Sequence, residues 1–142
     1  PLPIYGTGEN IRDWLYVSDH AEALVSVLLA GEAGEVYNIG GGAEKSNIDL
    51  VHLICDLLDH MVPDSPYGPH SDLVTFVEDR PGHDFRYSID DTKIRRELGW
   101  VPKWGLEEGL RHTVAWYVAN KDWMESVKNK SYSHSRRGLG ER

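Results

Sequence analysis

The sequence is poor in cysteine, in basic residues and in long apolar runs. Cys55 is the only cysteine, which excludes an internal disulfide and suits the reducing cytoplasm, where we expect the protein to reside. Its 15 basic residues against 23 acidic ones give a net charge of -8, so we expect no nucleic-acid partner and no anionic membrane surface. The longest apolar stretch, near residues 21–30, is too short to cross a bilayer.

The length of 142 residues fits one domain, and an apolar content of 40% with five Trp and seven Tyr is enough for a core. The first residues already have the pattern of a strand, so we expect the chain to be truncated at Pro1. The segment from Ser133 to Arg142 has three Arg, two Gly and no apolar stripe. We therefore predict a domain over residues 1–132 and, over 133–142, a disordered tail or one added in cloning.

Apolar periodicity and turn residues predict alternating strands and helices. Asp19 with Glu22 is expected to cap one helix, and Ser46 or Asn47 to start another. The stripe of the second helix is Leu50, Val51, Ile54, Leu57, Leu58 and Met61. The predicted strands are residues 2–5, 11–17, 35–39 and 73–77, and the predicted helices are 19–30, 47–61, 90–99 and 106–123.

Two arginine-containing turns are candidate anion sites. Arg12 follows a Gly-x-Gly turn, and a guanidinium offers two parallel donors to phosphate oxygens. Arg80-Pro-Gly-His83 is a tight turn that would aim its two cationic side chains to one side. From spacing alone, the more common outcome for Arg12 is a surface ion pair with Asp13 or Glu9, and the second turn could simply be solvated.

Two further side chains are suited to a nucleotide, each with an ordinary structural alternative. Asn38 precedes Gly40-Gly41-Gly42, where an amide could reach a phosphate or ribose and glycine lets a ligand approach the backbone. The alternative is an Asn that satisfies the turn. Tyr5 could stack on a base, or it could be a core tyrosine. The histidines have no metal-binding spacing, and Cys55 fits a buried, inert thiol.

Taken together and in order, these motifs resemble the dTDP-glucose 4,6-dehydratases, which are extended short-chain dehydrogenases/reductases. The similar strings are Leu-Pro-Ile-Tyr-Gly, Ile-Arg-Asp-Trp-Leu-Tyr-Val, Tyr-Asn-Ile-Gly-Gly, Asp-Arg-Pro-Gly-His-Asp and Glu-Leu-Gly-Trp. The likeness runs from Pro1 to about Tyr132 and corresponds to the C-terminal, nucleotide-sugar-binding part of that family. The implied fold class is α/β, with most of the Rossmann sheet lacking.

The resemblance implies roles for individual residues. Arg12 and Arg80 would hold the diphosphate of a dTDP-sugar, with His83 beside them. Pro3 and Tyr5 would lie against the base, Asn38 would bond phosphate or ribose, and Tyr132 would close the sugar side. The family uses bound NAD to oxidise the sugar at C4, eliminates water across C5 and C6, and returns the hydride to C6. We expect its Gly-rich NAD loop and catalytic Tyr-x-x-x-Lys pair to be absent here, so this chain should bind no NAD and be inactive alone.

The resemblance also predicts assembly. Helix 19–30 and strand 35–39 would belong to the large nucleotide-binding sheet, and without it they would present an apolar face and a bare edge. We expect a homo-oligomer or pairing with the missing N-terminal half. The alternatives are part of a related UDP-sugar epimerase or decarboxylase, or a stand-alone nucleotide-sugar-binding or interaction module without catalysis.

Overall fold

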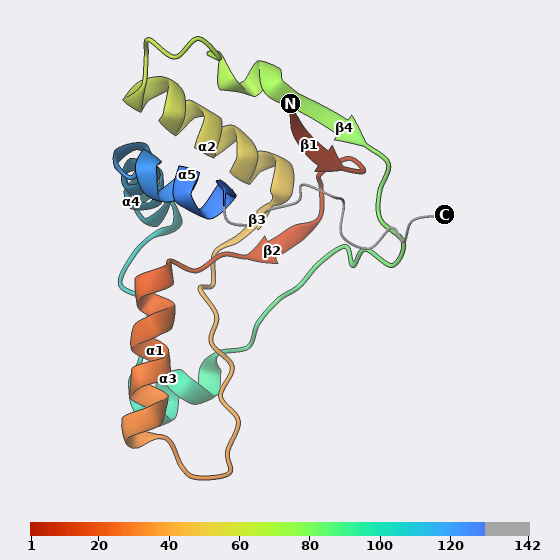
Figure 1. Cartoon of the computed structure of the whole chain (residues 1–142). Coiled ribbons are helices and arrows are strands. Elements are labelled where there is room, and N and C mark those ends of the chain that lie inside the picture. The colour runs from red at the N-terminus through yellow and green to blue at the C-terminus, as the bar shows by residue number, and fades with distance from the viewer. Residues whose placement is uncertain (130–142) are drawn as a thin grey trace.

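The computed structural model describes residues 1–129 as short strands alternating with helices (Figure 1). Tyr132 and the predicted tail lie outside the described residues. The elements are β1 (Leu2–Tyr5), β2 (Ile11–Asp13), α1 (Val17–Ala30), β3 (Glu44–Ser46), α2 (Asn47–Met61), the 3-10 helix η1 (His70–Leu73), β4 (Val74–Val77), α3 (Thr92–Leu98), α4 (Leu106–Ala119) and α5 (Lys121–Asn129).

The strands of the described chain form two small sheets rather than one large one. β1 pairs with β4 in parallel, with Leu2 opposite Val74 and Tyr5 opposite Val77. β2 pairs antiparallel with β3, with Ile11 opposite Ser46. The predicted α/β class is confirmed, and within residues 1–129 only this limited sheet structure is present.

The helices gather at two ends of the structure. Figure 1 shows α1 beside α3 at one end, and α2, α4 and α5 at the other, with β2 and β3 between them. The first group encloses a core of Ala23, Ile94 and Trp100, against which Val27 and Tyr37 pack. Because β2 leads directly into α1, the position of this helix is tied to the strand that carries Arg12.

Helix α2 follows the sequence prediction closely. Ser46 caps it, and its hydroxyl accepts the Asp49 amide N–H at 3.2 Å. Leu50 and Cys55 are buried, and burial raises the pKa of the Cys55 thiol, with the carboxylates of Asp59 and Asp56 adding to the rise. Cys55 is thus the inert thiol that its position on the apolar stripe predicts.

Asp19 was predicted to cap α1, and that prediction is wrong. The helix begins two residues earlier, with Tyr16 at the N-cap position and no side-chain cap. Asp19 is instead almost completely buried, and one of its oxygens accepts the Trp104 amide N–H at 3.0 Å. A long-range bond to the loop before α4 has replaced the local cap, which the sequence pattern could not reveal.

The predicted strand 35–39 does not form in the described chain, and the predicted helix 106–123 is two helices. A strand needs a neighbour to satisfy its backbone groups, and the carbonyl of Val36 bonds to the Lys93 ammonium instead. The long helix breaks at Asn120, whose side-chain amide donates to the Trp116 carbonyl at 2.7 Å. Strand β3 was not predicted, because its sequence Glu-Lys-Ser has no apolar alternation.

One face of α1 is apolar and solvent-exposed. Ala23 and Val27 face the core, whereas Leu24 is 52% exposed and Leu28 is 83% exposed. Val25 and Leu29 of the same helix are also exposed, as is Val36 beyond its end. Among residues 1–129, no helix combines the length and apolar character that crossing a membrane requires.

Candidate anion-binding site

The pairing of β1 with β4 brings two distant parts of the sequence together. The strands are parallel, so the segments that follow Tyr5 and Val77 leave the sheet at the same end. The Gly6 amide N–H donates to the Val77 carbonyl at 2.9 Å, which fixes this exit. The turn with Arg80 and His83 therefore lies beside the loop that leads to Arg12.

Arg12 braces the segment that follows this turn. The Ile11 amide donates to the Phe85 carbonyl at 2.8 Å, and the Tyr87 amide donates to the Ile11 carbonyl at 3.1 Å. The Arg12 guanidinium donates to the carbonyls of Ile11 and Asp84 and lies 4.5 Å from the centre of the Tyr87 ring. Within the described part of the chain these bonds use Nη1 and Nη2, and a guanidinium has five N–H donors in all.

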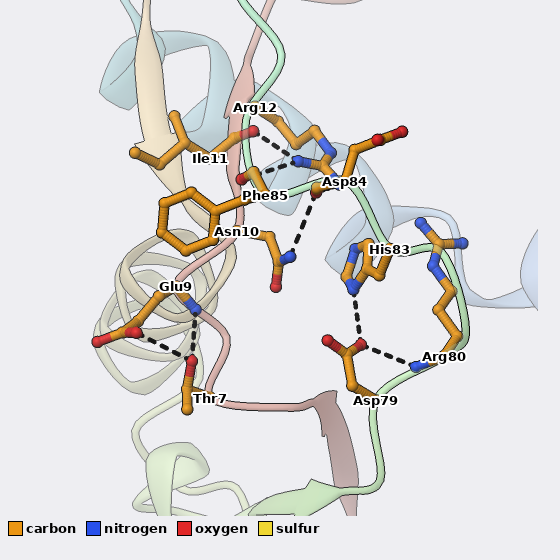
Figure 2. A network of polar contacts seen from close by, with 10 residues as sticks. All are labelled: Thr7, Glu9, Asn10, Ile11, Arg12, Asp79, Arg80, His83, Asp84 and Phe85. Carbon is orange, nitrogen blue, oxygen red and sulfur yellow. Dashed lines mark hydrogen bonds and ion pairs between the residues drawn. The ribbon is translucent and has the colours of Figure 1, made fainter.

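Arg80 and His83 stand on one turn, with Gly82 in the left-handed conformation at φ 68°. The Asp79 carboxylate accepts the Arg80 amide N–H at 2.8 Å and the His83 Nδ1–H at 2.7 Å. Figure 2 shows the Arg80 side chain reaching along the turn to the level of His83. The His83 side chain is only 5% exposed, so its ring is held in place rather than free in solvent.

The pKa of the Tyr87 hydroxyl is affected by both Arg12 and Arg80. A hydrogen bond and the charge of Asp84 raise the pKa of the Tyr87 hydroxyl, while the positive charges of Arg12 and Arg80 oppose the rise. Both guanidinium groups therefore act on the same phenol. Because the net effect is still a rise, the Asp84 carboxylate outweighs the two cations at this point, and binding of an anionic ligand would depend on directed N–H donors.

Asn38 lies apart from the Arg12 network, although both contact the segment of residues 84–90. Its amide donates to the Asp90 carbonyl at 3.2 Å, whereas Arg12 contacts the backbone at Asp84 and Phe85. The Gly40-Gly41-Gly42 turn is bound by the Asp13 carboxylate, which accepts the amides of Gly41 at 3.0 Å and Ala43 at 2.9 Å. These amides are therefore not available to cradle the diphosphate of NAD, and among residues 1–129 this turn does not fit that cofactor.

The two predicted base-contacting residues sit on β1. Pro3 is exposed and borders a small apolar cavity with Ile54 and Leu58 of α2, and Tyr5 is half-buried at the strand end. The described residues contain no group of three His, Cys, Asp or Glu side chains that could hold a metal ion. Of the seven predicted site residues, Arg12, Arg80 and His83 are thus brought to one region.

Sequence reasoning missed Asn10, Asp79 and Tyr87 as members of this network. Asn10 is buried, and its amide donates to the Asp84 carbonyl at 3.3 Å. The available signals were an Asn two residues after a Gly-x-Gly turn and an Asp directly before Arg-Pro-Gly-His. Both are common turn residues, so their pattern alone did not distinguish a structural role.

A separate apolar cavity of about 740 Å³ lies between the start of α1 and the helices α4 and α5. Tyr16, Trp104 and His112 contact one another edge-on or tilted in its wall, with the ring centres of Trp104 and His112 4.6 Å apart. Trp116 and Trp123 complete the aromatic lining.

Comparison with known proteins identifies the family. A profile of the family described as GDP-mannose 4,6 dehydratase matches residues 1–113. The chain belongs to this dehydratase family. It is 55% identical over 142 residues to a dTDP-glucose 4,6-dehydratase of Neisseria meningitidis, covering 99% of this chain and 40% of that protein. The predicted resemblance to dTDP-glucose 4,6-dehydratases is confirmed.

Solved structures of dehydratase-like enzymes agree with this assignment. DesIV, a dTDP-glucose 4,6-dehydratase of Streptomyces venezuelae with NAD and TYD bound, is 42% identical with a TM-score of 0.76, over 89% of this chain and 36% of that one. A UDP-glucose 4-epimerase of Thermotoga maritima with UDP-glucose is 31% identical with a TM-score of 0.67, over 84% of this chain and 35% of that one. The chain thus spans well under half the length of the dehydratases it matches.

The dehydratase resemblance directs attention to one pair that the sequence prediction overlooked. The spacing Tyr-x-x-x-Lys does occur once, at Tyr117 and Lys121, so the expected absence of this pattern was wrong. The helix breaks at Asn120, which leaves Tyr117 in α4 and Lys121 in α5. The Tyr117 ring packs edge-on against Trp116 at 5.2 Å. The pair therefore does not lie on one continuous helix, where the two side chains would project from the same face.

Proposed function

We propose that this chain is the substrate-binding part of a dTDP-glucose 4,6-dehydratase, which converts dTDP-glucose to dTDP-4-keto-6-deoxyglucose. The observation that carries the proposal is the convergence of Arg12 with the Arg80–His83 turn (Figure 2). Two guanidinium groups and a fixed imidazole are suited to a diphosphate, because charge-assisted hydrogen bonds to phosphate oxygens are strong and directional.

The remaining residues receive roles from the same proposal. Arg12 and Arg80 hold the diphosphate and His83 lies beside it. Asn38 reaches the phosphate or ribose, and Pro3 with Tyr5 lies against the base. Tyr132 closes the sugar side. In the whole enzyme NAD supplies the hydride chemistry, and this chain alone binds no NAD and performs no turnover.

Identity favours a dehydratase over an epimerase. The similarity to the Neisseria dehydratase is 55%, against 31% for the Thermotoga epimerase. Dehydratases and epimerases of this kind both bind a nucleoside diphosphate, so a diphosphate-binding site alone does not distinguish them. The strings Arg-Asp-Trp-Leu-Tyr-Val and Arg-Pro-Gly-His-Asp are the features that favour the dehydratase.

The exposed face of α1 supports a partner for this chain. Leu24, Leu28 and Leu29 present an apolar surface that a monomer in water would rarely leave uncovered. We propose that it pairs with the remaining part of a dehydratase chain or with a second copy, in the cytoplasm. The low cysteine content is consistent with that compartment.

Calorimetric titration with dTDP tests the diphosphate grip. Arg80→Ala should weaken dTDP binding by about 1.5–3 kcal/mol, the usual contribution of a hydrogen bond to a charged group. Thymidine, which lacks the phosphates, should bind wild type and variant alike. Arg96→Ala is the matched control, because Arg96 is an exposed arginine of α3 paired with Glu97.

Three results would contradict this assignment. They are failure of the wild-type chain to bind dTDP, equal binding by Arg80→Ala, and an equal loss in Arg96→Ala. The last would indicate a general charge effect rather than a site. Comparison of dTDP with UDP in the same titration addresses the epimerase alternative, which predicts preference for UDP.

A further inference from the structure

The Asp79 carboxylate occupies a central position in the turn that carries Arg80 and His83. One of its oxygens, Oδ1, accepts both the Arg80 amide N–H at 2.8 Å and the His83 Nδ1–H at 2.7 Å. These two bonds close the turn from its first residue to its fifth (Figure 2). A single atom therefore sets the backbone from which Arg80 projects and the orientation of the His83 ring.

The Asp79 carboxylate packs against Gly6, the residue that follows β1. A Cβ atom at Gly6 would lie 3.0 Å from Asp79 Oδ2 and 3.1 Å from its Cγ. Gly6 also adopts a positive φ of 58°, which glycine tolerates at little cost. The Gly6 position thus provides a close-fitting wall for Asp79, and this wall is attached to β4 through the bond from the Gly6 amide to the Val77 carbonyl.

The bond to His83 also determines which ring nitrogen can meet a ligand. With Nδ1 donating to the carboxylate, Nε2 is the nitrogen on the opposite side of the ring, and it donates to a phosphate oxygen only when it also carries a proton. A carboxylate behind a ligand-binding histidine fixes both its tautomer and its orientation. The hydrogen bond from His83 lowers the pKa of Asp79, so this carboxylate stays ionised at neutral pH.

We propose that Asp79 is a positioning residue, which orients His83 and Arg80 as one anion-binding unit against the Gly6 wall. This inference rests on the proposed binding of a dTDP-sugar and deepens it. Asp79 does not touch the ligand, because its carboxylate carries the wrong charge for a diphosphate. Its effect on binding passes through the two groups that it holds, the His83 ring and the backbone amide of Arg80.

The test uses the whole chain with Asp79→Asn, which keeps the shape and removes the charge. Asp72→Asn is the matched control, since Asp72 is an exposed aspartate of η1 just before β4. The first readout is the ¹⁵N NMR signal of the His83 ring, assigned by its loss in His83→Gln. Asp79→Asn should shift this signal away from the Nδ1–H form, and Asp72→Asn should leave it unchanged.

The second readout is calorimetric binding of dTDP and of inorganic pyrophosphate. Asp79→Asn should weaken both by about 10-fold, by analogy with removal of the carboxylate behind a metal-binding histidine. Asp79→Glu, which restores the charge on a longer arm, should recover part of the loss. A purely structural role would give no such recovery and no selective change at the His83 ring.

The outcomes separate this inference from the function on which it rests. If the wild-type chain binds no dTDP, the proposed function fails and the inference fails with it. If wild type binds but Asp79→Asn binds equally well, only the positioning role is overturned. An unchanged His83 signal in Asp79→Asn also overturns it, whatever the affinities.

Discussion

Gly8 is the residue at which a single added methyl group should do most damage to the loop between β1 and β2. It adopts a positive φ of 76°, and a Cβ atom there would lie 2.7 Å from Ile4 Cγ2 and 2.9 Å from Ile48 Cβ. Its carbonyl also accepts the Ile48 amide N–H at 3.0 Å. The residue therefore joins β1 to the start of α2, and a shift there would move the segment that leads to Arg12.

The expected cost of Gly8→Ala has two parts. A non-glycine residue in the left-handed region costs about 1–2 kcal/mol, and forcing a methyl group into an occupied site costs about 1–3 kcal/mol more. Gly42→Ala isolates the first part, because Gly42 has a similar φ of 65° with no heavy atom within 4 Å of the added Cβ. The difference between the two variants should be about 1–3 kcal/mol, which is the steric part alone.

Urea unfolding followed by circular dichroism measures both variants against wild type. A steric cost lowers the midpoint of Gly8→Ala well below that of Gly42→Ala, while the slope stays common to all three proteins. Equal midpoints for the two variants would refute the reasoning, because they would show that Ile4 and Ile48 yield without cost. Equal dTDP affinity of folded Gly8→Ala and wild type would refute the link to Arg12.

Three further predictions follow from the same structure. Incubation of the chain with dTDP-glucose and NAD should give no 4-keto-6-deoxy product, because Tyr117 and Lys121 lie in separate helices, and any product above a blank contradicts this. Light scattering should show a dimer or larger assembly, which Leu28→Glu on the exposed face of α1 should disrupt and Glu32→Gln should not; a wild-type monomer would refute the role of that face. The hydrogen bond from His70 lowers the pKa of Asp59 from 3.8. The stabilisation of the fold by this Asp59–His70 pair is therefore present at neutral pH and is lost as pH falls below about 4. Asp59→Asn should flatten the acid side of the curve of unfolding free energy against pH, and an unchanged acid side would count against a role for the Asp59–His70 pair.

Local signals in the sequence were enough for some elements. The start of α2 at Ser46 depends on a side-chain cap three residues from its partner, and the end of α3 at Gly99 depends on a left-handed residue that glycine favours. β1 and β4 also lie where their apolar residues predict them. The short sequence motifs were enough to predict the family, and the family profile that matches residues 1–113 confirms it.

The failures occurred where a distant segment decided the outcome. Asp19 has the sequence context of a helix cap, yet its partner is the Trp104 amide, which no local pattern specifies. Residues 35–39 have the composition of a strand, but strand formation requires a pairing neighbour. The Tyr117–Lys121 pair is a different kind of failure, because its spacing is present in the sequence and was overlooked, and the break at Asn120 that separates the two residues is local.

The sequence by itself determined the helices with strong caps, the family and the residue types suited to a diphosphate, because each depends on neighbours along the chain. Only the tertiary structure decided how the site is built. Arg12 and Asp84 are 72 residues apart, and they meet because β1 pairs with β4 in parallel and both exits lie at one end of the sheet. The role of Asp79 likewise depends on the Gly6 wall from the other strand, a contact that exists only after the two strands have paired.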